Sequence, residues 1–318
     1  MDTSPRPSVG TQPDKPAGLS GMGQEAAGPT AVRADNDWTA ERPEGRRGRR
    51  ILRVGVVLLV FAAALALLAF LMLRTGDGRS GLQAKPVPHP PSLYDYGTAA
   101  AANGMTLHYL KTAPSNVTLT VVRDNVAIAP YYGINGGFFY DSSLLSMAIV
   151  DGMPVAGDGS ATGGFGSGAE NVKYARGTLV WDRESERHSV QVASNAAELN
   201  VANHARYWAQ GGISMSLGRD ASWHDQAVAE HAPFMDEPRL RTGAVYDDEG
   251  SLYLVVSENR GTLADFRAAI LEVLGGQGRP ALADGIFLDG DGSSQLRSRE
   301  ASLRGDLRPV VQMISLLD

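Results

Sequence analysis

The chain has 318 residues, a formal net charge of −6 and no cysteine. The lack of cysteine excludes a small scaffold held by disulfides, so a folded part of this chain must depend on a hydrophobic core. The charge is uneven, with 17 basic and 27 acidic residues after residue 85. This acidic surplus argues against nucleic acid as a partner.

Residues 1–50 are predicted to form a disordered cytoplasmic tail. They are dominated by Pro, Gly, Ser, Ala and charged residues, and Trp38 is their only aromatic residue. Such a composition cannot bury enough apolar surface to fold. The tail ends in four arginines within residues 46–50, which suit the anionic head groups of a lipid surface.

Residues 51–74 are predicted to form a transmembrane helix. The stretch from Val54 to Leu73 holds no charged or strongly polar side chain, and at about 1.5 Å per residue it spans a hydrocarbon core of roughly 30 Å. Basic residues favour the cytoplasmic side, so we expect a single-pass protein in the cell membrane with its C-terminal domain outside. A cleaved signal peptide is the alternative, but the fifty-residue leader and the missing A-x-A site disfavour it.

The remainder divides into a Pro-rich stalk at 75–95 and one extracytoplasmic domain at 96–318. Short apolar or alternating runs separated by turn residues predict a strand-rich domain. The predicted strands are Val117–Val122, Val126–Ile134, Met147–Val150, Gly177–Trp181, Ser189–Val192, Thr242–Tyr246, Leu252–Val256, Ile286–Leu288 and Val310–Leu316.

Two helices and one long loop complete the predicted elements. Thr262–Leu274 combines a capping threonine with one apolar stripe, and Gly275 and Gly276 end it. Asn195–Trp208 is a weaker helical pattern. Gly157–Gly168 is a glycine- and serine-rich loop, either mobile or a lid over a site. The predicted class is α+β, a strand-rich mixed-sheet domain with few helices.

Two glycine-rich turns concentrate polar groups at the ends of predicted strands. The first is Asn135-Gly136-Gly137-Phe138-Phe139, and the second runs from Leu288 to Gln295 with the sequence LDGDGSSQ. Glycine lets the chain turn through positive φ and lets a ligand lie against main-chain N–H groups. Each turn is therefore a candidate for a small anionic or polar site.

Five segments between about Tyr131 and the C-terminus form an ordered set: Asn135–Phe139, Gln210–Ile213, Arg241–Ala244 with Gly250–Val256, Glu258–Arg260 and Leu288–Ser294. In this order they resemble the motifs of the phosphodiester glycosidase family. The chain differs from the family pattern at three positions. Asp291 and Asn259 stand where the family has glycine, and Ile213 stands where it has proline.

The resemblance implies hydrolysis of a sugar–phosphate diester at the bond from the anomeric carbon to oxygen. Such chemistry needs a carboxylate and a cation for the leaving phosphate. The resemblance assigns Asp289 as nucleophile or base, Glu258 as the second carboxylate, and Arg241 as the clamp on the phosphate. Asn135 is expected to bind substrate hydroxyls or to orient Asp289.

Further expectations concern the surroundings of these residues. The predicted substrate-binding residues besides Asn135 are Gly136, Gly137, Thr242, Gly290, Gly292, Ser293 and Ser294. No cofactor is expected, although Asp289 and Asp291 could together hold a divalent cation. The added carboxylate of Asp291 could instead tune a pKa or impair phosphate binding.

The sequence therefore predicts a membrane-anchored hydrolase that cleaves glycosyl phosphodiesters in envelope or extracellular glycans. Two alternatives stay open. The domain could be an inactive module that binds glycan or phosphate, which the departure at Asp291 favours. It could also be an accessory protein of polysaccharide export.

Overall fold

The computed structural model describes residues 63, 83–157, 159, 163–276 and 278–317. The predicted tail 1–50, the transmembrane helix 51–74 apart from Ala63, and the first part of the stalk lie outside this range. Within it, no helix is both long and apolar enough to cross a bilayer. The chain divides into two compact units at Gly78, and the description below concerns the second unit.

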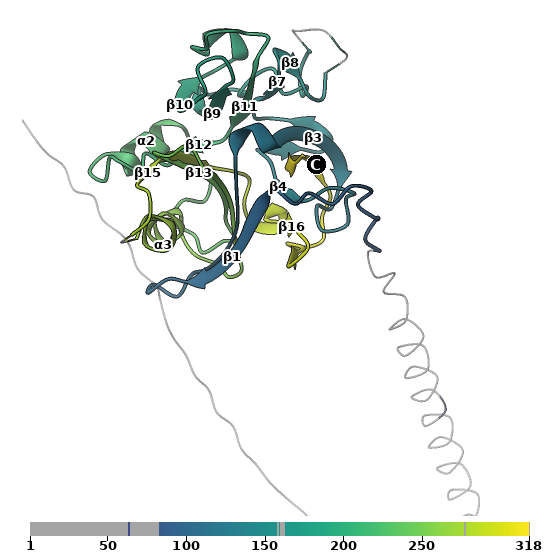
Figure 1. Ribbon diagram of the computed structural model, residues 1–318, viewed down its shortest axis with the longest axis vertical. Helices are drawn as coiled ribbons and strands as arrows, with labels where there is room; N and C mark the ends of the chain where they lie inside the picture. Colours follow the sequence, from purple (N-terminus) through teal and green to yellow (C-terminus); the bar gives the residue numbers. More distant parts are fainter. Residues whose placement is uncertain (1–62, 64–82, 158, 160–162, 277, 318) are drawn as a thin grey trace, which may run out of the picture. The chain divides into compact units, whose positions relative to one another are not determined.

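The described domain is strand-rich, with two α-helices and four antiparallel sheets among the described residues (Figure 1). Its largest sheet has the order β1-β2-β14-β13-β15-β12, formed by Tyr94–Ala100, Thr106–Thr112, Leu252–Ser257, Thr242–Asp247, Leu282–Phe287 and Ile213–Ser214. The second has the order β10-β9-β11-β7-β8, formed by Arg187–Ala193, Arg176–Asp182, Tyr207–Gly211, Ala148–Val150 and Met153–Pro154. The third has the order β17-β16-β4-β18-β3, formed by Ser302–Leu303, Leu296–Arg297, Gly133–Asn135, Val310–Leu316 and Val117–Asp124. The strands β5 (Phe139–Tyr140) and β6 (Ser143–Leu144) pair with each other.

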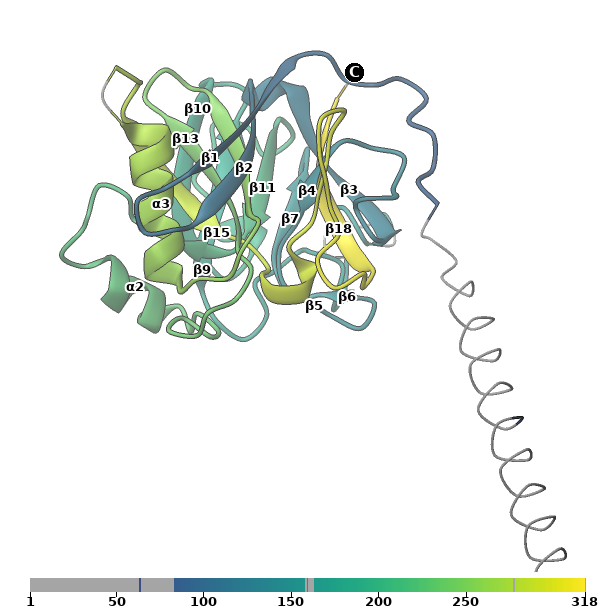
Figure 2. The ribbon, with the colours of Figure 1, turned by 90° about the horizontal axis from the view of Figure 1, so that it is seen from below.

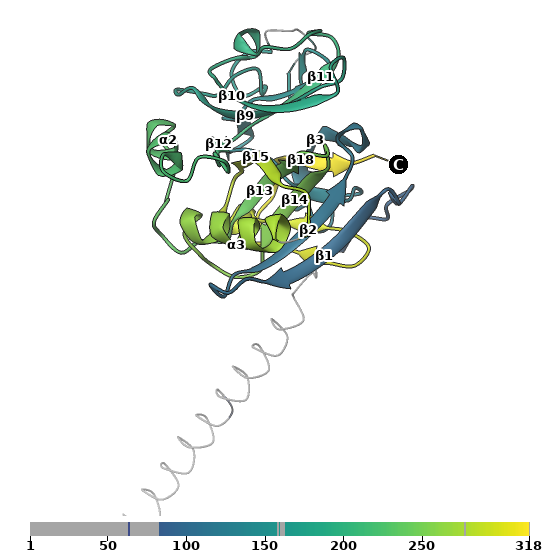
Figure 3. The same cartoon turned by 60° about the vertical axis from the view of Figure 1, so that its left-hand side comes forward.

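The helix α3 (Leu263–Gly275) confirms the prediction for this segment. Thr262 and Asp265 form a reciprocal capping box at its start, which satisfies backbone N–H groups that the first turn leaves open. The helix lies along the six-stranded sheet beside β1 and β13 (Figures 2 and 3). Its buried face includes Phe266, Ile270 and Leu274. The other helix, α2 (Trp223–Ala229), is short.

The second predicted helix, Asn195–Trp208, is wrong. Asn195 caps only a short 3₁₀ turn, Ala196–Glu198, and the chain then enters β11 at Tyr207. Tyr207–Gly211 pairs with β9, and Trp208 is fully buried there. Cross-strand pairing and aromatic burial override a weak helical pattern.

The predicted strand Val126–Ile134 is also mostly wrong, because only Gly133–Asn135 forms a strand. Asn125 caps a turn instead, accepting a hydrogen bond from the N–H of Ala127 at 3.0 Å. Pro130 lacks the N–H that a continuous ladder would need. The predicted hairpins at β9–β10 and β13–β14 are confirmed by their antiparallel pairing.

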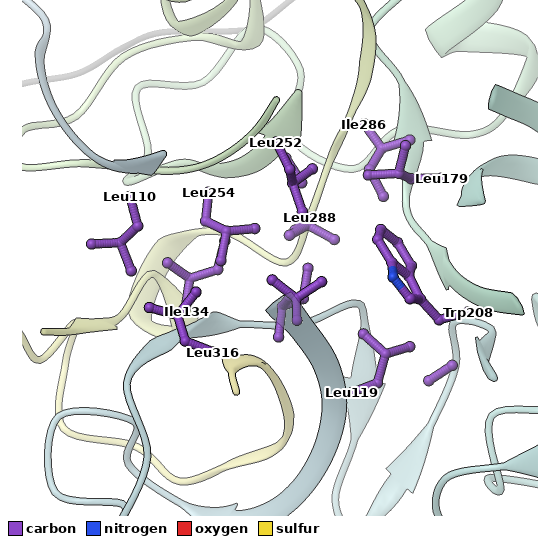
Figure 4. Close-up of a cluster of buried hydrophobic side chains, with 14 of the residues drawn as sticks. Leu110, Leu119, Ile134, Leu179, Trp208, Leu252, Leu254, Ile286, Leu288 and Leu316 are labelled. Carbon is purple, nitrogen blue, oxygen red and sulfur yellow. The ribbon is translucent and has the colours of Figure 1, made fainter. Parts of the chain in front are cut away.

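The main core lies where the three large sheets meet. Leu110 and Leu254 come from the six-stranded sheet, Ile134 from β4, and Leu179 and Trp208 from the β9–β11 sheet. Figure 4 shows these side chains gathered around one interior. Because β4, β13 and β15 all border this core, the ends of β4 and β15 are held close to the start of β13.

Candidate functional site

The two glycine-rich turns meet at one buried side chain, the amide of Asn135. Its Nδ2 donates to the backbone carbonyl of Asp289 at 2.8 Å. Its Oδ1 accepts hydrogen bonds from the N–H of Gln295 and the hydroxyl of Thr242, both at 3.0 Å. One amide therefore joins β4, the turn after β15 and the start of β13.

Close packing explains the glycines of the first turn. A Cβ at Gly136 would lie 1.7 Å from Oε1 of Gln312, and one at Gly137 would lie 2.7 Å from the carbonyl of Gly211. Both glycines are buried, and neither lines the cavity described next. Their role is to let neighbouring chain segments approach, which differs from the predicted contact with substrate.

A cavity of about 150 Å³ opens beside Asp289. Its polar wall consists of Arg239, Arg241, Asp289, Gly290, Asp291 and Arg308. Its apolar wall consists of Phe138, Ile213, Pro233, Phe234, Leu263, Phe287 and Leu288. The structure thus brings four predicted site residues, Arg241, Asp289, Gly290 and Asp291, together in one place.

Asp289 has the most perturbed carboxyl group of the described site. The residue as a whole is partly accessible to solvent, but its carboxyl group is buried. Burial raises the pKa of Asp289 to about 7, against opposing effects of a hydrogen bond from Ser293 and the charge of Arg308. The carboxyl therefore exists in both protonation states near neutral pH, as proton-transfer chemistry requires.

Arg241 is a buried guanidinium that mainly holds backbone. Its Nε donates to the carbonyl of Gly261 at 2.9 Å, and its Nη2 donates to the carbonyls of Phe234 and Glu237 at 2.7 and 2.6 Å. The side chain makes no ion pair within the described residues. Burial, followed by the charge of Arg239, lowers the pKa of Arg241 to about 10, so it stays charged at neutral pH.

Arg239 lies in the same wall and is paired to two carboxylates. Its Nη1 donates to Asp291 at 2.7 Å, and its Nη2 donates to Glu237 at 2.7 Å. Asp291 has a φ of 53°, in the left-handed region that glycine favours. A non-glycine residue there costs roughly 1–2 kcal/mol, and Asp tolerates the region better than most residues.

Arg308 completes the polar wall. Its Nε donates to both carboxylate oxygens of Asp306 at 2.9 Å. A Cβ at Gly292 would lie 2.1 Å from Oδ2 of Asp306. Gly292 therefore makes room for this ion pair and does not itself line the cavity.

Three further predicted substrate-binding residues lie behind the cavity wall. Thr242, Ser293 and Ser294 are each 1% exposed, and none of them lines the cavity. The hydroxyl of Ser293 donates a hydrogen bond to the carboxyl of Asp289, and the hydroxyl of Thr242 donates to Oδ1 of Asn135. The Oγ of Ser294 is buried without a hydrogen bond inside the part of the chain described. These residues support the site from behind, because their side chains are enclosed by protein.

Glu258, the predicted second carboxylate, lies outside this cavity. It follows β14 and lies 3.4 Å from Nε2 of His108, on the β2 side of that strand. Its side chain is 58% exposed and does not line the cavity. The second carboxylate in the cavity wall is Asp291.

The geometry does not favour the suggested cation site at Asp289 and Asp291. No group of three or more His, Cys, Asp or Glu side chains with metal-ligand spacing occurs among the described residues. Asp291 is already paired with Arg239, and three guanidinium groups share the wall. Their positive charge opposes a divalent cation and suits an anion.

Sequence reasoning missed Arg239 and Arg308. The first had a usable signal, since Arg239 and Arg241 are two residues apart and side chains at this spacing share a face of an extended chain. The sequence held no such signal for Arg308, because Arg308 reaches the cavity only where the chain turns back to enter β18. The apolar wall likewise depends on segments such as Pro233 and Phe234, which no motif marks.

A second, more open groove lies elsewhere on the domain. It measures about 760 Å³ and is lined by residues that include Tyr94, Lys111, Trp181 and Glu249. Although it is larger, it contains none of the predicted site residues. The smaller cavity is the better candidate because it holds the perturbed carboxyl group.

Comparisons with known proteins do not assign a family. No protein-family model matches the chain, and no curated protein matches it significantly. A hypothetical protein from Synechocystis is similar over 70% of this chain and 61% of its own length, at 12% identity and a TM-score of 0.41. A provisionally assigned exported protein from Burkholderia pseudomallei is similar over 68% of this chain and 74% of its own, at 13% identity and a TM-score of 0.43. These likenesses are too distant to carry an argument about function.

We expect Asn135→Ala to lower the free energy of unfolding by about 3 kcal/mol, because it leaves several buried polar groups without partners. Chemical denaturation of the full-length protein measures this change. Asn103→Ala is the matched control: Asn103 also makes two hydrogen bonds to backbone but is exposed, so its loss should cost about 1 kcal/mol or less. Equal losses in the two variants would contradict the central role of Asn135.

Proposed function

We propose that this chain is a membrane-anchored extracytoplasmic glycosidase that hydrolyses sugar-1-phosphodiesters of envelope or extracellular glycans. The observation that carries the proposal is a carboxyl group with a pKa of about 7 in a cavity shared with three guanidinium groups. The sequence resemblance supplies the reaction class, and the apolar run Val54–Leu73 supplies the membrane anchor.

The guanidinium groups are suited to hold the phosphate of the substrate. Arg239 and Arg308 are partly exposed and line the cavity, so each can present donors to a phosphate oxygen. Arg241 contributes mainly its charge, because Nε and Nη2 already serve three backbone carbonyls. This arrangement differs from the single clamp by Arg241 that the resemblance implies.

Asp289 is suited to act as the general base. In the proposed reaction, the bond from the anomeric carbon to the phosphate oxygen breaks, and the electron pair leaves with the phosphate monoester. A water molecule forms the new bond to the anomeric carbon, and the ionised carboxylate of Asp289 accepts its proton. A phosphate ester is a good leaving group, so a strong general acid is not required.

A binding module without turnover is the second candidate, and Asp291 is the observation that favours it. Its carboxylate lies in the cavity wall, where the family pattern has glycine, and it already pairs with Arg239. Calorimetry with a panel of sugar-1-phosphodiesters separates the candidates. Binding with no release of free sugar by the wild type would favour the module.

We expect Asp289→Asn to reduce kcat by about 100-fold or more, since a positioned general base contributes roughly 10²- to 10⁴-fold. Release of free sugar from a panel of methyl sugar-1-phosphodiesters measures this loss. Asp284→Asn is the matched control: burial raises the pKa of Asp284 too, but Asp284 lies outside the cavity. Equal rates for wild type and Asp289→Asn across the panel would rule out the assignment.

The pH dependence should follow the ionised form of Asp289. We expect kcat/KM to rise about tenfold per pH unit below about pH 7 and to level off above it. The corresponding limb of kcat should lie at higher pH, because a bound phosphate anion raises the pKa of Asp289 further. A profile that falls through pH 7 would instead assign Asp289 as the acid, and a flat profile would exclude both roles.

A measurement of stability against pH separates the loss of the Asp289 base from misfolding of the Asp289→Asn variant. The folded-state pKa of Asp289 is raised, so its contribution to stability is present below its unfolded pKa and is lost as pH rises through about 7. Asp289→Asn lacks this loss. Its free energy of unfolding relative to the wild type should therefore increase from pH 4 to pH 8.

A further inference from the structure

Arg239 is held at the cavity by two carboxylates and one aromatic ring. Asp291 and Glu237 each accept hydrogen bonds from its guanidinium, and the group lies 4.7 Å from the ring centre of Phe234. These contacts fix both the position and the plane of the guanidinium. A fixed planar guanidinium can meet a phosphate with paired donors.

The two carboxylates that hold Arg239 differ in one respect. Asp291 lines the cavity, whereas Glu237 does not and is 54% exposed. The charge of Asp291 therefore faces whatever enters the cavity, and that of Glu237 is screened by water. Both residues can position Arg239, but only Asp291 acts directly on the ligand's charge.

The charges of the cavity wall are closely balanced. Among the residues that line the cavity, three guanidinium groups face the carboxyls of Asp289 and Asp291, which leaves one positive charge when both carboxyls are ionised. Asp306 and Glu237 pair with Arg308 and Arg239 from outside this lining. One added negative charge fits this balance. A second would lie near two carboxylates, which repel it.

We propose that Asp291 is a specificity-determining residue: it positions Arg239 and restricts the cavity to singly charged phosphodiesters, excluding doubly charged phosphomonoesters. The inference rests on the proposed function and deepens it. Hydrolysis of a phosphodiester releases a phosphomonoester, which is mostly a dianion at pH 7 and above. The carboxylate of Asp291 therefore repels the dianionic product more strongly than the monoanionic substrate.

Two small probes test the charge preference without any turnover. Dimethyl phosphate carries one charge, and methyl phosphate carries two at pH 8. Neither contains a sugar, so neither can be hydrolysed at an anomeric carbon. Calorimetry on the full-length protein at pH 8 gives the ratio of the two dissociation constants.

We expect the wild type to bind dimethyl phosphate more tightly, and Asp291→Asn to shift the ratio about tenfold toward methyl phosphate. Asn is chosen because it tolerates the left-handed φ of position 291 and removes the charge. Asp291→Gly is the second variant, since glycine adopts this φ without strain, and it should shift the ratio in the same direction. Glu237→Gln is the matched control, in which both affinities should fall in parallel with the ratio within about twofold of the wild type.

The outcomes separate this inference from the proposed function. If the Asp291 variants bind both probes with the wild-type ratio, or if Glu237→Gln shifts the ratio equally, the inference fails and the proposed function stands. If the wild type binds neither probe, the cavity is not a phosphate site, and both the inference about Asp291 and the proposed function are ruled out.

Discussion

The buried amide of Asn135 is the interaction on which the rest of the site depends. It bonds to the backbone of Asp289 and Gln295 and to the hydroxyl of Thr242, so it fixes three strand ends relative to one another. A side-chain amide suits this position because it offers both donors and acceptors in one plane. Neither a carboxylate nor an apolar residue of similar size could satisfy the carbonyl of Asp289 and the N–H of Gln295 together.

Dehydration then sets the chemistry of the groups that this framework holds. Burial destabilises a charged carboxylate and a charged guanidinium alike, so it raises the pKa of Asp289 and lowers that of Arg241. The consequences differ because the starting values differ. Asp289 is moved into the range where it can exchange protons near pH 7, while Arg241 remains a permanent cation. Burial thus makes Asp289 a titrating acid, whereas Arg241 keeps its positive charge despite burial.

The sequence predicted the elements whose signals are local. The capped helix at Thr262–Leu274 and the hairpin between β13 and β14 depend on neighbouring residues, and both are present. The helix predicted at Asn195–Trp208 is absent because its helical spacing was weak and the aromatic residues at its end pair with β9 in a sheet. The glycine turns lie at strand ends beside the cavity, but the motif could not distinguish residues that line the cavity from residues that pack behind its wall. That distinction depends on tertiary neighbours such as Gln312, which excludes any side chain at Gly136.

Glu258 illustrates why a motif can order residues along the chain without bringing them to one cavity. It follows β14, whose partner on one side is β13 and on the other is β2. The cavity opens on the β13 side, whereas the carboxylate of Glu258 turns to His108 on β2. Asp291, in contrast, lines the cavity, and the backbone turns through the left-handed region at Asp291 itself, two residues after Asp289. In the proposed site the charge of Asp291 would face the anion, and its pairing with Arg239 offsets the repulsion that an uncompensated carboxylate would impose there.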